Sequence, residues 1–244
     1  MTSIQTEPRT AQTATLPADG RVLVTGGASG LGAAVVSALL ERGATPIVVD
    51  RAEARVEGVA QRQADVGDAA QLASVIADVV DEFGGLDAVV TAAGIDRPGR
   101  LDEVPADEWE RVVQVDLLGT AAAVRAALPA LKESHGRVVT VASTLALKGV
   151  SDATAYCAAK FGVLGFSRAL AAELAGEVGV TTLIPGGMRT AFFDGRSPQY
   201  APPSDAALND PARTADAVVF ALAQPRGCEV RELLIAHESE PSWP

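Results

Sequence analysis

The chain has 244 residues, a mass of 24.9 kDa and 48% hydrophobic residues, which excludes a wholly disordered chain and a disulfide-stabilised miniprotein. Its 20 basic and 31 acidic residues give a net charge of −11 and a pI near 4.6. Such a surface repels phosphate backbones and anionic lipids. We therefore expect a small-molecule partner and neither nucleic acid nor a membrane.

The N-terminal composition and the cysteines favour a cytoplasmic protein with one domain. Cys157 and Cys228 are the only cysteines, and they lack CxxC or metal-type spacing, which is typical of a reducing compartment. Residues 1–18 are polar and lack an apolar signal core, so we expect a flexible tail before a single domain at 19–244. Residues 22–40 carry no charge and are long enough for a membrane span, but their four glycines favour a strand, a turn and a helix.

Short β-branched runs alternate with longer alanine-rich helical patterns in the rest of the chain. This alternation predicts an α/β fold, a doubly wound parallel sheet of about seven strands flanked by helices. The expected strands are Val22–Thr25, Ile47–Asp50, Gln63–Val66, Leu86–Thr91, Arg137–Ala142, Val180–Ile184 and Glu232–Ala236. The expected helices are Leu31–Arg42, Ala69–Phe83, Ala106–Lys132, Ala153–Ala175 and Ala212–Ala223. Residues 191–211 hold four prolines and break the alternation, so we expect them to form a lid over the substrate.

A glycine-rich turn, TGGASGLG at residues 25–32, follows the first predicted strand. Glycine lets a pyrophosphate approach the bare backbone, and the next helix presents free N–H groups to that phosphate. The spacing is GxxxGxG rather than the commoner GxGxxG, and an ordinary strand-to-helix loop is the alternative. The cofactor contacts that we expect in this turn are Gly26, Ser29, Gly30, Leu31 and Gly32.

Asp50 ends the second predicted strand, 24 residues beyond Gly26. A carboxylate at this position can accept both hydroxyls of an adenosine ribose and repels a 2′-phosphate. Ser29 is uncharged where a basic side chain could bind that phosphate, whereas Arg51 could bind it. We expect the carboxylate to dominate, so the sequence predicts NAD as the cofactor, with NADP less favoured. A helix N-cap is the alternative role of Asp50.

Tyr156 and Lys160 lie four residues apart, on one face of a predicted helix. Ser143 follows the fifth predicted strand, at the sheet edge where open α/β folds bind ligands. A free phenol has a pKa of about 10, too high for a base at neutral pH, but a neighbouring ammonium and a nicotinamide cation favour the phenolate. We expect Tyr156 to exchange the proton of an alcohol while Ser143 hydrogen-bonds the substrate oxygen. A turn cap, a core ring and a surface charge are the structural alternatives for the three residues.

These motifs, together with AAG at 92–94 and PGGMRT at 185–190, resemble the short-chain dehydrogenase/reductase family in its compact single-domain branch. The resemblance covers about residues 20–236. It implies a Rossmann-type fold, a homodimer or homotetramer, and an NAD-dependent oxidoreductase that interconverts a secondary alcohol and a ketone. It also implies that Lys160 holds the nicotinamide ribose, that Asp65 accepts from the adenine amino group, and that residues 185–190 fix the carboxamide. The cofactor contacts implied in this way are Tyr156, Lys160, Asp65, Val66, Ala92, Ala93, Gly94, Pro185, Gly186 and Thr190.

Asp116 is a departure from the family pattern, because the family usually has asparagine there. The asparagine supports a water that links the lysine to solvent, largely through its main chain, so Asp116 could preserve that role. Its carboxylate could also strengthen the ammonium of Lys160, or compete for it and weaken its effect on Tyr156. We therefore include Asp116 among the candidate catalytic residues.

Two alternative functions stay open on the sequence alone. One is a 3-oxoacyl thioester reductase that uses NAD(P)H, and the other is a nucleotide-binding regulator on the same fold with weak or lost catalysis. Phe192, Phe193 and Tyr200 fall in the expected lid, where they line an apolar substrate pocket or pack into the core. His135 and His237 lack partners at metal-ligand spacing, so no metal site is expected.

Overall fold

A computed structural model of the protein describes residues 19–54 and 56–240, so the tail predicted at residues 1–18 lies outside the described residues. The chain forms one parallel sheet of seven strands in the order β3-β2-β1-β4-β5-β6-β7. This Rossmann-type α/β topology confirms the predicted fold class. The strands are β1 (Arg21–Thr25), β2 (Thr45–Asp50), β3 (Ala60–Gln63), β4 (Ala88–Thr91), β5 (Arg137–Val141), β6 (Gly179–Pro185) and β7 (Glu232–Ile235).

The third strand was predicted at residues 63–66, and that position is wrong by three residues. β3 pairs Ala60 with Ile47 and Gln63 with Asp50 at the edge of the sheet. Its sequence, AQRQ, contains no β-branched residue, so it lacks the pattern that marks the central strands. The side chain of Gln61 instead bonds the backbone of Ala52 and Ala54, which fixes this edge to the segment after β2.

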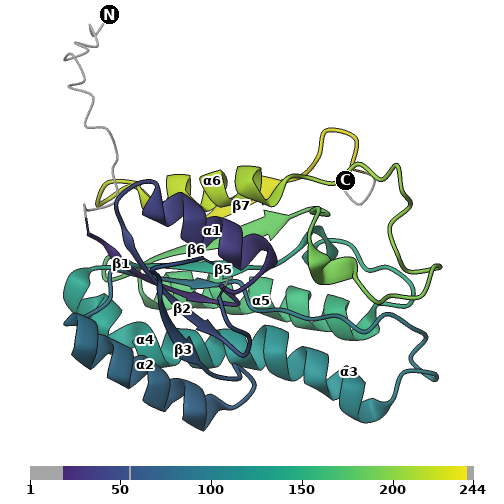
Figure 1. The fold of residues 1–244 in the computed structure, drawn as a ribbon, viewed down its shortest axis with the longest axis horizontal. Helices are drawn as coiled ribbons and strands as arrows, with labels where there is room; N and C mark the ends of the chain where they lie inside the picture. The colour runs from purple at the N-terminus through teal and green to yellow at the C-terminus, as the bar shows by residue number, and fades with distance from the viewer. Residues whose placement is uncertain (1–18, 55, 241–244) are drawn as a thin grey trace, which may run out of the picture.

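The helices cover the sheet in two layers (Figure 1). α1 and α6 lie together on one face, and α2, α4 and α5 cover the other. The helix predicted at 106–132 is continuous, but it contains a π-helical stretch, η1, between α3 and α4. The bounds are α1 (Gly30–Leu40), α2 (Ala69–Phe83), α3 (Ala106–Val113), η1 (Gln114–Gly119), α4 (Thr120–Ser134), α5 (Thr154–Glu173) and α6 (Pro211–Leu222). Two short 3-10 turns, η2 (Thr144–Ala146) and η3 (Ala191–Phe193), follow β5 and β6.

A separate hydrophobic cluster fills each side of the sheet. Leu23 and Ile47 pack against Ile76 of α2, whereas Val24 packs toward Val35 of α1. Residues 22–40, which have the length of a membrane span, are divided into β1, the glycine turn and α1, as the sequence favoured.

One helical stretch, Ala106–Ser134, is long and apolar enough by composition to cross a membrane. It packs on α2 and α5 within the fold. A core helix passes the same test, so this stretch is weak evidence for a span.

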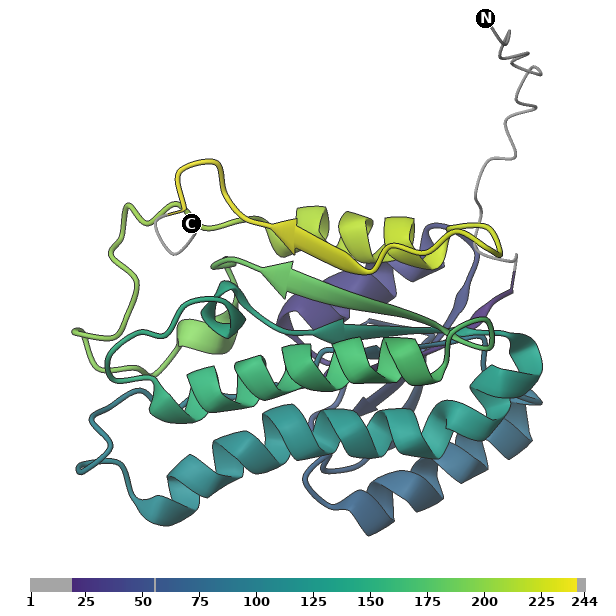
Figure 2. The same ribbon diagram turned by 180° about the vertical axis from the view of Figure 1, so that it is seen from behind.

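The segment predicted as a lid runs from η3 to the start of α6. Pro211 is already the first residue of α6, with Asp210 as its N-cap, so the irregular stretch is one residue shorter than predicted. Figure 2 shows this segment beyond the ends to which the strand arrows point, near the loop that joins β4 to α3. The candidate site lies at this carboxyl edge of the sheet, beside the segment after β6.

Candidate active site

Ser143 comes two residues after β5 and lies against Tyr156 of α5. The Ser143 hydroxyl lowers the pKa of the Tyr156 phenol, so the two groups are within range to interact. Its Oγ also accepts a hydrogen bond of 3.1 Å from the backbone N–H of Leu145, which caps η2. The catalytic and capping interpretations of Ser143 are therefore compatible, because the cap holds the hydroxyl in place beside the phenol.

Lys160 lies one helical turn after Tyr156, and its side chain points into the protein. The Lys160 Nζ is 5.4 Å from the centroid of the Tyr156 ring. It donates a 3.1 Å hydrogen bond to the backbone carbonyl of Val141, at the end of β5, and only 4% of the residue is exposed. Because Lys160 is buried, its interpretation as a surface charge is wrong. The spacing of four residues places the Tyr156 and Lys160 side chains on the same face of α5, at the edge of the sheet.

Asp116 forms an ion pair with Lys160, with 3.1 Å between Oδ2 and Nζ. Its other oxygen accepts a 2.8 Å hydrogen bond from the backbone N–H of Ile95, and the residue is fully buried. Asp116 belongs to η1, a π-helical stretch of the kind that often marks functional positions in helices. A Cβ at Gly94 would lie 3.2 Å from Oδ2, so glycine leaves room for this pair.

The expected lowering of the Tyr156 pKa requires the nicotinamide cation of the cofactor as well as the Lys160 ammonium. Burial raises the pKa of Tyr156, and the lowering effect of Lys160 does not compensate. The Asp116 carboxylate raises the Tyr156 pKa further. Burial alone would lower the pKa of Lys160, but Asp116 raises it above its usual value and keeps it an ammonium.

The glycine turn approaches the loop after β4 too closely for any side chain. Gly26 has a φ of +71°, and a Cβ there would lie 2.6 Å from the backbone of Ala93. A Cβ at Gly32 would overlap the carbonyl oxygen of Gly26. Ser29 makes no side-chain cap hydrogen bond, so the first N–H groups of α1 stay available to an anion. This cradle fits the pyrophosphate of a dinucleotide.

Asp50 is hydrogen-bonded to the backbone of this turn. Its Oδ2 accepts a 3.0 Å hydrogen bond from the N–H of Ala28, and its Oδ1 accepts one of 2.9 Å from Ala52. The carboxylate is therefore fixed at the end of β2, next to the phosphate cradle. The Arg51 side chain is exposed, and its guanidinium lies 3.9 Å from the Asp65 carboxylate.

Asp65 lies two residues beyond the end of β3, and its carboxylate is engaged by Arg111 of α3. The Arg111 Nη2 lies 2.7 Å and 2.5 Å from the two oxygens, and the N–H of Gly67 donates to Oδ1 at 2.8 Å. Although burial opposes them, these partners lower the pKa of Asp65. An adenine amino group would share its oxygens with Arg111. Val66 is buried beside the backbone of Gly119.

The remaining predicted cofactor residues gather at the same edge of the sheet. The N–H of Ala92 donates to the carbonyl of Thr25 at 3.1 Å, and Thr190 lies beside Gly30. Pro185 ends β6, and the N–H of Gly186 donates to Ile235 at 2.8 Å. The structure therefore brings together the residues around the glycine turn and the end of β6 that the sequence identified separately.

Two charged residues near the site were missed by the sequence analysis. Arg196 lies 2.9 Å from Asp96, which follows β4. Its guanidinium stacks 4.9 Å and 4.7 Å from the rings of Phe192 and Phe193. Phe192 in turn packs 5.7 Å from the Tyr156 ring. The position of Asp96 just after Gly94 could have marked it, but no local pattern pairs it with Arg196.

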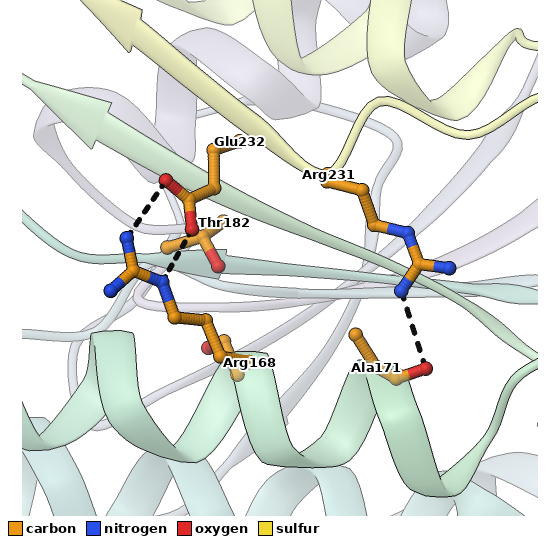
Figure 3. A pocket seen from close by; sticks show the side chains of 6 residues that line it. Arg168, Ala171, Thr182, Arg231 and Glu232 are labelled. Atoms are coloured by element: carbon orange, nitrogen blue, oxygen red, sulfur yellow. Dashed lines mark hydrogen bonds and ion pairs between the residues drawn. The ribbon is translucent and has the colours of Figure 1, made fainter.

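A shallow pocket between α5 and β7 lies outside this site (Figure 3). Arg168 and Glu232, which line this pocket, form an ion pair, and Arg231 donates a hydrogen bond to the carbonyl of Ala171. Arg168 is 12 residues beyond Tyr156 on α5, which corresponds to about 18 Å along the helix. Among the described residues, no group of three or more His, Cys, Asp or Glu side chains is placed to hold a metal ion.

Comparison with known protein sequences gives relatives of nearly the same length. An uncharacterized oxidoreductase of Staphylococcus aureus (strain MW2) is 32% identical over 232 residues, covering 91% of this chain and 98% of the relative. The L-fucose dehydrogenase of Mus musculus is 30% identical over 239 residues, covering 90% and 88% of the two chains.

Solved structures share the fold. The alcohol dehydrogenase of Thermococcus sibiricus, complexed with 5-hydroxy-NADP, superposes with a TM-score of 0.82 at 25% identity, over 91% of this chain and 97% of the other. The aldohexose dehydrogenase of Thermoplasma acidophilum gives a TM-score of 0.81 at 23% identity, over 90% and 93% of the two chains. The sequence profile of the short chain dehydrogenase family matches residues 20–201. With this site and these relatives, the chain belongs to the short chain dehydrogenases, a family of oxidoreductases.

Proposed function

We propose that the protein is an NAD-dependent dehydrogenase that interconverts a secondary alcohol and a ketone. The observation that carries the proposal is the grouping of Ser143, Tyr156 and Lys160 beside the glycine turn. The kinship with an L-fucose dehydrogenase and an alcohol dehydrogenase supports an alcohol as the substrate.

Each residue of the group has one task in this reaction. The bound dinucleotide supplies the redox chemistry, with its nicotinamide ring as the hydride acceptor. Tyr156 takes the hydroxyl proton of the alcohol and returns it in the reverse direction. Ser143 donates a hydrogen bond to the substrate oxygen, which holds that oxygen beside the phenol. Lys160 supplies a buried positive charge that favours the ionised phenol, and Asp116 keeps the lysine protonated.

The fixed position of Asp50 supports NAD rather than NADP. Its two hydrogen bonds hold a negative charge beside the turn that receives the adenosine half. A 2′-phosphate placed there would lie against this charge, whereas free ribose hydroxyls can donate to it. Arg51, the basic residue that could offset the repulsion, has its charge partly balanced by the Asp65 carboxylate at 3.9 Å.

Steady-state kinetics with both cofactors test the proposal. With a panel of secondary alcohols, we expect kcat/KM for NAD⁺ to exceed that for NADP⁺ by at least about tenfold. Asp50→Asn should reduce this preference, because the amide removes the charge, and Asp78→Asn on the exposed face of α2 is the matched control. A preference for NADP⁺ would contradict the assignment and favour the 3-oxoacyl thioester reductase. Nucleotide binding without turnover of any alcohol would favour the regulator.

A further inference from the structure

The Asp96–Arg196 pair is an unusual feature of the wall that faces Tyr156. The side chains are only 8% and 13% exposed, although both come from irregular segments, the loop after β4 and the stretch between η3 and α6. Long charged side chains are seldom buried unless they are paired. Here the ion pair joins the two segments that border the site.

The pair leaves two buried polar atoms without a hydrogen-bond partner among the described residues. One is an acceptor, Oδ1 of Asp96, and the other is a donor, Nη2 of Arg196. Nη2 lies 2.9 Å from Asp96 Oδ2, so the charges are in contact, but this contact lacks hydrogen-bond geometry. Buried groups of this kind are costly to leave unsatisfied, and a ligand that satisfies both gains that free energy on binding.

Both atoms lie close to the reacting groups. Arg196 stacks on Phe192, and Phe192 packs on the Tyr156 ring. The charge of Asp96 acts on Tyr156 and on Lys160. Ile95, the residue before Asp96, is hydrogen-bonded to Asp116. A small molecule whose hydroxyl meets Tyr156 therefore extends toward the ion pair.

An acceptor beside a donor matches a group that both donates and accepts one hydrogen bond. A hydroxyl does so, since it can donate to Oδ1 of Asp96 and accept from Nη2 of Arg196. An anionic substrate is disfavoured, because the two buried cations named here already have carboxylate partners, Lys160 with Asp116 and Arg196 with Asp96.

We propose that Asp96 and Arg196 form a subsite for a second hydroxyl, so that the substrate is a neutral diol or polyol. The proposal rests on the alcohol oxidation proposed above. The segment that carries Arg196 must move to admit such a substrate, because both atoms are shielded from solvent in the closed arrangement. When it closes again, the second hydroxyl orients the substrate relative to Tyr156.

Matched pairs of alcohols test the subsite, with cyclohexane-1,2-diol against cyclohexanol and butane-2,3-diol against butan-2-ol. We expect kcat/KM of the wild-type protein with NAD⁺ to be at least about tenfold higher for each diol, since only the diol satisfies the buried pair. Asp96→Leu/Arg196→Met removes the acceptor and the donor together and should bring the ratio to within about threefold. Arg168→Gln/Glu232→Gln, which removes the exposed pair in the pocket of Figure 3, should leave the ratio unchanged.

Calorimetric binding of the same probes separates this proposal from the function on which it depends. The titrations use the NAD⁺-loaded Tyr156→Phe protein, with NADH affinity as the check that each variant is folded. A diol that binds more tightly than its monoalcohol but is never oxidised by the wild-type protein would support the subsite and contradict the proposed reaction. Turnover without a diol preference, or a preference that survives in Asp96→Leu/Arg196→Met, would overturn the subsite alone. If no probe binds or reacts, both proposals are wrong.

Discussion

At the scale of single residues, the site depends on how one phenol is balanced between burial and two opposite charges. Burial and the Asp116 carboxylate raise the pKa of Tyr156, whereas the Lys160 ammonium lowers it. The carboxylate also holds the lysine in its charged form. Asp116 is thus a positioning residue that acts on Tyr156 partly through Lys160.

Replacing Asp116 by asparagine should move the pH dependence of alcohol oxidation. Oxidation needs the ionised phenol, so its rate rises as the pH passes the pKa of Tyr156. The amide removes a negative charge that raises this pKa, and its oxygen can still accept from the N–H of Ile95. We expect the rising limb of kcat/KM to shift about one unit toward acid pH in Asp116→Asn. An unchanged profile would show that the carboxylate is silent, and a shift toward alkaline pH would show that it serves mainly to keep Lys160 charged.

The sequence predicted those site residues that share a short stretch of chain. Tyr156 and Lys160 are neighbours on one helix, and Ser143 follows a recognisable strand. The sequence could not predict that Arg111 would form an ion pair with Asp65, because the two residues meet only through the packing of distant segments. The opposing effect of burial on the Tyr156 pKa was likewise inaccessible, since it depends on how the distant segments pack.

At the scale of elements, the helix that carries Asp116 shows what periodicity can and cannot reveal. The apolar pattern correctly predicted a long helix over residues 106–132. It gave no sign of η1, which widens one stretch of that helix and places Asp116 beneath the lysine. Within η1 the apolar Leu118 is exposed whereas Asp116 is buried, so the hydrophobic pattern does not mark the residues that this stretch turns inward.

The N-terminus of α2 provides a test of local stability away from the site. The Asp68 carboxylate accepts hydrogen bonds of 3.1 Å and 3.0 Å from the N–H groups of Ala70 and Gln71. Asp68→Ala should lower the free energy of unfolding by about 1 kcal/mol, because these N–H groups lose their partner. Urea denaturation measures the loss, with Asp78→Ala on the exposed face of the same helix as the control. Equal losses in the two variants would exclude a specific capping contribution.

At the scale of the whole molecule, the residues that stabilise the fold and the residues of the candidate site lie in different parts of the sheet. Its two faces are packed by separate clusters, while the glycine turn, the triad and the segment after β6 lie together at the carboxyl edge. The alternation of strands and helices was enough to predict this topology, because right-handed crossovers leave few arrangements. The prolines of residues 191–211 predicted a lid, but the contact between Arg196 and Asp96 could not be predicted, because it joins segments far apart in the sequence.

A core substitution should therefore weaken the fold without changing the site. Ile76 of α2 is fully buried between the helix and the sheet. Ile76→Ala should lower the free energy of unfolding by about 2–5 kcal/mol through lost contacts and a cavity. The KM for NAD⁺ should stay close to that of the wild-type protein. Ser74→Ala, on the exposed side of α2, is the control, and a large rise in KM at full stability would contradict this separation.

The most direct measurement of the central claim compares Tyr156→Phe with the wild-type protein in turnover and in NADH binding. Removing only the phenol oxygen should lower kcat for alcohol oxidation by at least about 10²-fold, the usual contribution of a positioned acid–base group. The dissociation constant for NADH should change by less than about threefold, since the glycine turn and Asp50 are untouched. Turnover close to that of the wild-type protein would contradict the assignment of Tyr156 as the proton-transfer residue.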